Sequence, residues 1–301
     1  MAVAVQRRRA ATYPVIMGRR IRIRWPSSQY LVLIPLAAFA ILPIVFIIST
    51  AFKPLEELLL FPPPFFVRRP TLDSFQELLL ATNALAVPFS RYLFNSVFVT
   101  LAAVLLQVLV CSLCAYPLSK AANLPGKNVI FGMIVAALMF APEVTAIPRY
   151  LVVQKLGLID SYSALILPGL AWPLGLFMMK QFMDNSAPMP IIEAARVDGA
   201  SEWTIFWRIV MPMCAPAWNT LLIFGFIAHW NDSFSPLVFT RSESMKTVSV
   251  AMISLTNGAN QPARMGAAAA AAFLMTAPTL IVFLLRQAKV IQTMAHSGIK
   301  S

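Results

Sequence analysis

The chain has 301 residues, of which 59% are hydrophobic and only 12% are charged. Soluble domains of this length carry roughly twice that charged fraction, so the composition excludes an ordinary soluble domain and indicates an integral membrane protein. The net charge is +12, from 24 Lys and Arg against 12 Asp and Glu. A basic excess is also typical of nucleic-acid-binding proteins, but its distribution here fits membrane topology better and predicts no nucleic-acid partner.

Six apolar runs predict an all-α integral membrane fold with six transmembrane helices. The first run, residues 30–51, has no charged residue, and its 22 residues are enough to cross a hydrocarbon core of about 30 Å as a helix. Because this run is longer than the apolar part of a signal peptide, we interpret it as a retained first span. The later runs are residues 92–118, 128–142, 161–179, 209–231 and 265–285.

Two of these runs are expected to be irregular. The run at 128–142 is short for a span, so we expect its helix to continue past Glu143. The run at 161–179 contains Pro168 and Pro173, which are expected to break its helix. Before the second run, residues 52–90 are polar and rich in proline, which predicts a loop with a short interfacial helix around residues 72–79.

The basic residues predict the orientation of these spans. An even number of spans places both termini on one side of the membrane, and the positive-inside rule assigns that side to the cytoplasm. In this arrangement 15 of the 24 Lys and Arg residues are cytoplasmic, with the strongest bias at the first span. The predicted divisions are a basic cytoplasmic tail at 1–29, a first transmembrane helix at 30–51, an external loop at 52–90, a core domain at 91–286 and a cytoplasmic C-terminal tail at 287–301.

The cytoplasmic segment 180–212 has the pattern of an amphipathic helix–turn–helix. Pro188 and Pro190 end the preceding element, because a proline cannot continue a helix, and the apolar residues after them predict a short helix. Asp198-Gly199 is typical of the turn that follows such a helix.

A second helix is expected to begin at Ser201, a predicted N-cap, and to end at Pro212. Its large apolar side chains recur at intervals of three and four residues, which predicts a single apolar face made by Trp203, Phe206, Trp207 and Val210. On pattern alone, the segment equally fits a surface loop that lies on the lipid headgroups.

The spacing within this segment resembles a known family signature. Glu193-Ala194-Ala195 is followed after three residues by Gly199, after nine more residues by Ile209, and after one further residue by Met211-Pro212. This pattern resembles the EAA signature of ABC importer permeases and departs from it only where Met211 replaces Leu. The resemblance implies that the first helix is a coupling helix that docks on a cytoplasmic ATPase, through Glu193, Ala194, Ala195, Asp198, Gly199, Ala200 and Pro212.

The resemblance also implies roles for these residues. Ala194 and Ala195 allow a partner to approach closely, and Gly199 permits a tight turn. Glu193 and Asp198 cap helix ends or pair with the ATPase, although Glu193 is equally explained as a solvated surface charge.

The resemblance extends over most of the chain. Five further segments are similar to the carbohydrate branch of these permeases, and specifically to the second permease subunit of maltose-type importers; they are Phe94-Asn95-Ser96, residues 147–151, residues 156–160, residues 166–168 and Trp230-Asn231-Asp232 with 236–238. This implies a type I ABC importer permease (MetI-like) fold, with residues 91–286 as the core transmembrane domain. It also implies a heterodimer with a second homologous permease, two cytoplasmic ABC ATPase subunits, an extracytoplasmic solute-binding protein and a prokaryotic cell membrane.

The chain lacks the motifs of an enzyme that hydrolyses ATP. No glycine-rich phosphate-binding loop is present, since Gly126-Lys127 is followed by Asn128 and has no glycine five positions earlier. We therefore expect no catalytic residue and no cofactor, and we expect partner chains to hydrolyse ATP. Cys111 and Cys114 lie in an apolar run without other ligands, which favours packing over a metal or redox site.

Polar and aromatic side chains within the apolar runs are candidates for the substrate path. Aromatic faces suit sugar rings and amides suit hydroxyl groups, whereas hydrogen bonding between helices is the alternative role for most of them. These candidates are Asn95, Gln107, Trp172, Trp218, Asn219 and His229. His229 is also the one candidate for a proton relay, because the apolar runs contain no Asp, Glu, Lys or Arg.

The hypothesis from the sequence is thus the permease subunit of an ABC importer for a carbohydrate. The same architecture importing another solute, such as glycerol phosphate, is the nearer alternative. An ATP-independent channel or carrier, or a membrane scaffold without transport, would lack an ATPase partner.

Overall fold

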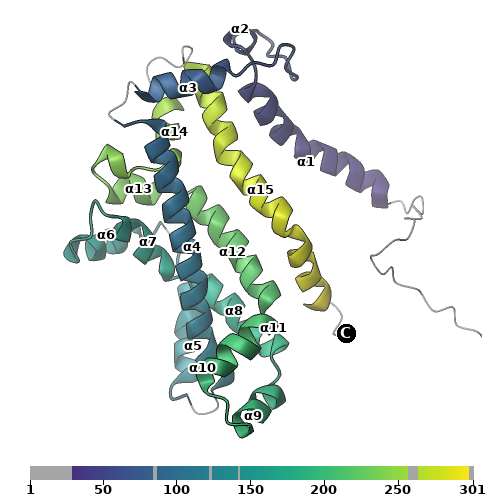
Figure 1. Cartoon of the computed structure of the whole chain (residues 1–301), viewed down its shortest axis with the longest axis vertical. Coiled ribbons are helices and arrows are strands. Elements are labelled where there is room, and N and C mark those ends of the chain that lie inside the picture. Colours follow the sequence, from purple (N-terminus) through teal and green to yellow (C-terminus); the bar gives the residue numbers. More distant parts are fainter. Residues whose placement is uncertain (1–28, 84–86, 122–123, 142, 257–263, 298–301) are drawn as a thin grey trace, which may run out of the picture. The chain divides into compact units, whose positions relative to one another are not determined.

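The computed structural model describes residues 29–83, 87–121, 124–141, 143–256 and 264–297 (Figure 1). Every regular element among these residues is a helix, which confirms the all-α prediction. The chain divides into two compact units at residue 44, and the division falls within helix α1, Gln29–Ala51. The basic tail, apart from Gln29, and Lys300 lie outside the described residues.

The segment that follows α1 folds around two buried charged side chains. Lys53 is 1% exposed and donates a hydrogen bond to the Pro64 carbonyl. Glu57, in the short helix α2 (Leu55–Leu58), accepts hydrogen bonds of 3.1 Å from the backbone N–H groups of Arg68 and Arg69. A buried charge is costly unless it is hydrogen-bonded in this way, so these contacts fix the shape of the loop. The short helix expected here is present as α3, Asp73–Asn83.

Three long helices lie side by side in the larger unit. Helix α12 (Ala215–Trp230) contacts both α4 (Phe89–Lys120) and α15 (Met265–Ser297), as Figure 1 shows. Near the start of α15, Ala267, Ala270 and Ala271 are buried, because small side chains let neighbouring helices approach closely. Helix α4 has 32 residues and is therefore about 48 Å long, more than the apolar thickness of a bilayer.

Two further apolar segments are interrupted helices. Helix α7 (Tyr162–Leu170) and α8 (Pro173–Ser186) meet at a bend of 45°. The expected break at Pro173 is confirmed, whereas Pro168 lies inside α7 and does not end it. A second bend of 77° separates α12 from the helical residues 202–213, which comprise α10 (Glu202–Ile205), a π turn (Phe206–Val210) and α11 (Met211–Met213).

The expectation of a long third span is wrong. Helix α5 ends at Ala137 after beginning at Lys127, and α6 does not begin until Ala146, ending at Lys155. After Ala137 the N–H groups of Leu138 and Met139 bond to carbonyls only three residues earlier, which tightens the chain into a turn. The remaining helices are α9 (Met189–Val197), α13 (Phe234–Phe239), a 3-10 turn (Glu243–Met245) and α14 (Val248–Thr256).

By length and composition, three described helices are able to cross a membrane, or up to five segments if each bent pair is one span. The count of six spans, the orientation of the termini and the divisions at residues 51, 90 and 286 stay predictions.

Candidate functional site

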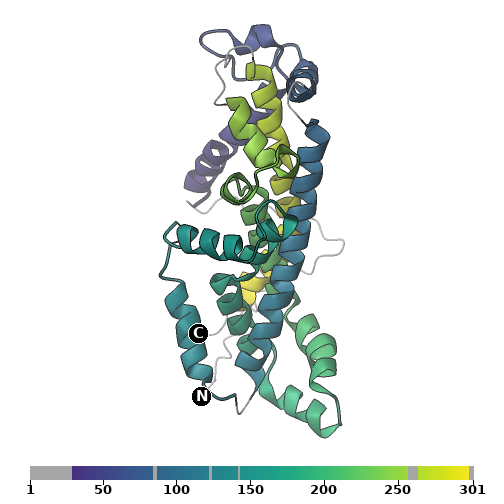
Figure 2. The same ribbon diagram turned by 90° about the vertical axis from the view of Figure 1, so that its left-hand side faces the viewer.

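The helix–turn–helix predicted from the sequence is present at one end of α4. Figure 2 shows it, as α9 to α11, on the opposite side of α4 from α5 and α6. The turn bonds back to α9, because the N–H groups of Gly199 and Ala200 donate to the carbonyls of Arg196 and Ala195, both at 3.0 Å. Gly199 has φ +81°, a conformation that favours glycine. Ser201 accepts a 3.2 Å hydrogen bond from the Thr204 N–H, which confirms the predicted N-cap.

The aromatic side chains of the predicted apolar face lie together, because the ring centroids of Trp203, Phe206 and Trp207 are 5.0 to 6.1 Å apart, but only part of this face is buried. Phe206 and Val210 are buried, whereas Trp203 is 62% exposed and Trp207 is 40% exposed. A π turn covers Phe206–Val210, after Trp203, and adds a residue to one turn of the second helix of this segment. The helical residues also continue past Pro212 to Met213, so Pro212 does not close the helix.

The residues predicted to couple to an ATPase divide into two groups. Glu193, Ala194, Asp198, Gly199 and Pro212 are exposed. The other two, Ala195 and Ala200, pack against a buried cluster that contains Ile192 and Ile205. The helix–turn–helix is thus attached to the rest of the chain through Ala195 and Ala200. Its exposed surface includes Ile191 and Val197, which are 43% and 87% exposed.

The break between α7 and α8 is held by side chains from α4. Pro173 has no N–H, so carbonyl groups before it lack the partners that a continuous helix would supply. The Gln107 Nε2 donates a 2.8 Å hydrogen bond to the Gly169 carbonyl, and the Cys111 thiol is 3.9 Å from the Trp172 carbonyl. Since Gln107 and Cys111 lie one turn apart on α4, one helix face serves both carbonyls.

His229 lies against the same break from α12. A Cβ atom added to Gly169 would be 2.5 Å from the His229 Cε1, so glycine is required by the packing. The Oε1 of Gln107 and the Nε2 of His229 are buried without a protein hydrogen-bond partner. Such atoms are expected to bind water or another polar group, because a buried polar atom left alone is costly.

Trp172 lines two adjacent cavities beside this break. One cavity has a volume of about 640 Å³ and is bounded by α5, α6 and α7, and the other has a volume of about 350 Å³ beside Cys111 and Cys114. The indole ring lies on Gly175, where an added Cβ would be 2.2 Å from the Trp172 Cε3. Among the described residues that line the larger cavity, Arg149 is the one charged residue, and most of the others are apolar.

The other predicted path residues hold segments together. Asn95 is fully buried and donates at 2.8 Å to the carbonyls of both Ser244 and Lys246. Trp218 donates to the Met211 carbonyl across the bend before α12. Asn219 accepts a 2.8 Å hydrogen bond from Arg286 on α15.

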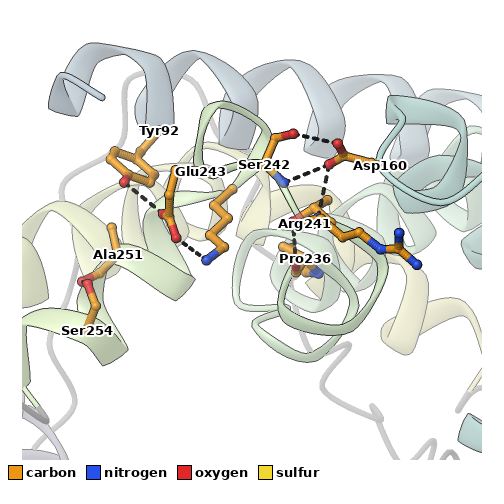
Figure 3. A network of polar contacts seen from close by, with 10 residues as sticks. Tyr92, Asp160, Pro236, Arg241, Ser242, Glu243, Ala251 and Ser254 are labelled. Atoms are coloured by element: carbon orange, nitrogen blue, oxygen red, sulfur yellow. Dashed lines mark hydrogen bonds and ion pairs between the residues drawn. The ribbon is translucent and has the colours of Figure 1, made fainter. Parts of the chain in front are cut away.

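A polar network fixes the loop before α14, at the end of α4 remote from α9 (Figure 3). One oxygen of Asp160 accepts hydrogen bonds from the N–H groups of Arg241 and Ser242, at 3.0 and 2.9 Å, and the other accepts from the Ser242 hydroxyl. These bonds, led by the hydroxyl, lower the pKa of Asp160. Nearby, Tyr92 donates to Glu243, which pairs with Lys246.

Sequence reasoning missed the role of Asp160. The structure shows why Asp suits this position, because its φ is +65° and Asp tolerates the left-handed region that most side chains avoid. In the described part of the chain, no three His, Cys, Asp or Glu side chains are grouped in a way that would hold a metal ion.

Comparisons with known proteins identify a family that this chain matches. The family described as "Binding-protein-dependent transport system inner membrane component" matches residues 26–289. The arabinooligosaccharides transport system permease protein AraQ of Halalkalibacterium halodurans is 28% identical over 88% of this chain and 93% of its own length. The sn-glycerol-3-phosphate transport system permease protein UgpE of Yersinia enterocolitica is 32% identical over 67% of this chain and 71% of its own.

A solved structure shares the fold. It is a bacterial ABC transporter involved in the import of the acidic polysaccharide alginate, and one of its chains matches with a TM-score of 0.71 and 23% identity. The match covers 87% of this chain and 98% of that chain.

Proposed function

Because the chain belongs to the family of binding-protein-dependent transport system inner membrane components, we propose that it is one transmembrane half of an ABC importer that moves a carbohydrate into a prokaryotic cell. As a member of this family it is a transport subunit and not an enzyme. The observation that carries the proposal is the fastened helix–turn–helix with an exposed face, on a chain of which 88% aligns with an oligosaccharide permease.

The proposed assembly has four further chains. A second homologous permease completes the transmembrane part, two ABC ATPase subunits bind on the cytoplasmic side, and a solute-binding protein binds on the other side. In this orientation the α9 end of α4 is cytoplasmic and the loops around Asp160 and Glu243 are external. A reporter fused after Leu60 should therefore be external, and a cytoplasmic signal would overturn this topology.

The proposed mechanism is rigid-body switching between two packed states. Loaded binding protein docks outside, ATP closes the ATPase subunits, and each subunit displaces one helix–turn–helix segment. The exposed residues Glu193, Ala194 and Asp198 are available to an ATPase surface, while Ala195 and Ala200 pack the segment against the rest of the chain.

Carbohydrate is favoured by the side chains around the helix break. Gln107 and His229, which lie at the break but outside the cavity linings, have buried hydrogen-bonding atoms without a strong charge, and Trp172 lines both cavities with an aromatic side chain. Sites for small polar ligands use a few such groups in a mainly apolar lining. A lipid surface is expected around the remaining apolar helices.

Glycerol phosphate is the second candidate, and Arg149 is the observation that favours it. A guanidinium is the preferred partner of a phosphate group, and Arg149 lines the larger cavity. A relative of 32% identity is also named for that solute.

Uptake by the complete co-expressed complex in proteoliposomes tests these proposals. We expect uptake of one labelled sugar that requires both ATP and the binding protein, and a clear loss with Trp172→Ala but a smaller one with Trp172→Phe. Leu174→Ala, a change at an exposed residue near the start of α8, serves as the control. Uptake of glycerol phosphate alone, abolished by Arg149→Gln, would select the second candidate. Uptake by this chain without ATP would overturn both.

A further inference from the structure

The turn between α9 and α10 is bridged by a forked ion pair. The Nε of Arg196 is 2.7 Å from Glu202 Oε1, and its Nη2 is 3.3 Å from Glu202 Oε2. Arg196 lies in the last turn of α9, and Glu202 is the first residue of α10. Two parallel contacts from a planar guanidinium fix an angle as well as a distance, so the pair fixes how the two helices meet.

The same ion pair is bonded to the end of α4. The Tyr116 hydroxyl donates a 2.5 Å hydrogen bond to Glu202 Oε2, and the Arg196 Nη2 donates to the Lys120 carbonyl at 3.3 Å. Tyr116 and Lys120 lie one turn apart, and the Tyr116 ring packs edge-on against Phe206 with 5.4 Å between centroids. Both helices of the segment are thus joined to α4.

The start of α9 is joined to α4 as well. Lys120 is 2% exposed, and its Nζ donates a 2.6 Å hydrogen bond to the Ala187 carbonyl, two residues before α9. One turn of α4 therefore contacts the helix–turn–helix both before α9 and after it. A displacement of α9 relative to α4 must break several of these bonds or carry α4 along.

The ion pair between Arg196 and Glu202 is expected to contribute little to the stability of the fold, so we consider a different role for it. The side chains of Arg196 and Glu202 are 31% and 56% exposed, and isolated pairs of that exposure contribute little. Their distinguishing feature is that they connect α9, α10 and α4 in one hydrogen-bonded group. Helix α4 then continues past the break between α7 and α8, where Gln107 bonds to Gly169, and on to the loops bonded by Asn95.

We propose that Arg196, Glu202 and Tyr116 form a clamp that makes α4 move with the coupling segment, so that they are positioning residues for energy coupling. This inference rests on the proposed function, because it assumes that an ATPase displaces α9. The clamp transmits displacement to α4, and α4 transmits it to the helix break and to the opposite loops.

The test measures solute imported per ATP hydrolysed by the complete complex in proteoliposomes. For Glu202→Gln and Arg196→Lys we expect this ratio to fall roughly fivefold to tenfold, within the range of ordinary coupling between sites, while the ATPase still copurifies. Tyr116→Phe removes one hydroxyl, keeps the ring contact with Phe206 and should lower the ratio less. Because the three residues act as one group, Tyr116→Phe should add little in the Glu202→Gln background.

Arg208→Gln is the matched control, because it removes an exposed positive charge from the same segment. An unchanged ratio in the Arg196, Glu202 and Tyr116 variants would overturn the clamp while leaving the importer intact. An equal fall of this ratio in Arg208→Gln would also overturn the clamp. The loss would then be caused by removing any positive charge from the segment, and not by breaking the clamp. Absence of ATP-dependent uptake in the wild type would instead overturn the proposed function.

Discussion

Helix α4 is fastened at both ends, but by different chemistry. At one end the buried Asn95 and the carboxylate of Asp160 bond mainly to backbone groups of the loop before α14. At the other end, the partly exposed Arg196 and Glu202 pair through their side chains and Glu202 bonds to Tyr116, beside a bond from the buried Lys120 to the Ala187 carbonyl. Bonds to backbone groups hold a loop in one shape, whereas side-chain pairs between helices fix an orientation that a partner is able to reset. We therefore expect the first end to be rigid and the second, with its exposed ion pair, to be movable.

The largest effect is expected at Gly199, in the movable end. Gly199→Val places a branched side chain at φ +81°, and the strain of about 1–2 kcal/mol should reshape the turn between α9 and α10. We expect ATP-dependent import to fall at least about tenfold, with ATP hydrolysis no longer linked to uptake.

Gly126→Val is the matched control for this prediction. Gly126 has φ +68°, and like Gly199 it has no heavy atom within 4 Å of an added Cβ, so the local strain is similar. It precedes α5 and lies outside the segment α9–α11. Equal losses in both variants would mean that strain in general, and not the coupling turn, reduces import.

A substitution at the rigid end of α4 should lower the thermal stability of the complex. Asn95→Ala removes a fully buried amide that donates to the carbonyls of both Ser244 and Lys246, and each such hydrogen bond contributes about 0.5–1.5 kcal/mol. We expect a loss of several degrees in the thermal unfolding midpoint of the purified complex. Asn231→Ala, which removes an exposed amide bonded within its own helix, should change the midpoint far less. If the two variants were equally stable, the end of α4 near Asn95 would not be the rigid one.

The sequence predicts the features of these two ends that depend on neighbouring residues, and it misses those that depend on residues far apart in the chain. Ser201 as an N-cap and the turn at Gly199 are local features, and both are predicted correctly. The π turn after α10 is missed, because it depends on how Phe206 and Val210 pack against α4 and α8. The role of Asp160 is also missed. Its hydrogen-bond partners lie about 80 residues further along the sequence, and no local pattern indicates them.

A smaller effect on import is expected at the break between α7 and α8, which lies between the two ends of α4. Gly169→Ala places a methyl group 2.5 Å from the His229 ring, and such overpacking costs about 1–3 kcal/mol. We expect reduced import that His229→Ala partly restores, because the smaller side chain makes room. Gly132→Ala in α5 is the control, since an added Cβ there meets nothing within 4 Å. Failure of His229→Ala to restore import would show that the contact between Gly169 and His229 is not the cause.

The smallest effect is a dependence of the rigid end on pH. The hydrogen bonds from Ser242 and Arg241 lower the pKa of Asp160 below its usual value of 3.8. Its contribution to stability is therefore complete above that value and is lost as the pH falls through the lower, folded-state pKa. Asp160→Asn removes the charge but keeps a residue that tolerates φ +65°. The difference in unfolding midpoint between wild type and variant should be constant from pH 7 to about pH 5 and should shrink below about pH 4. A difference that instead grew in acid would mean that the carboxylate is not the stabilising form, and that the loop before α14 is held by its other contacts.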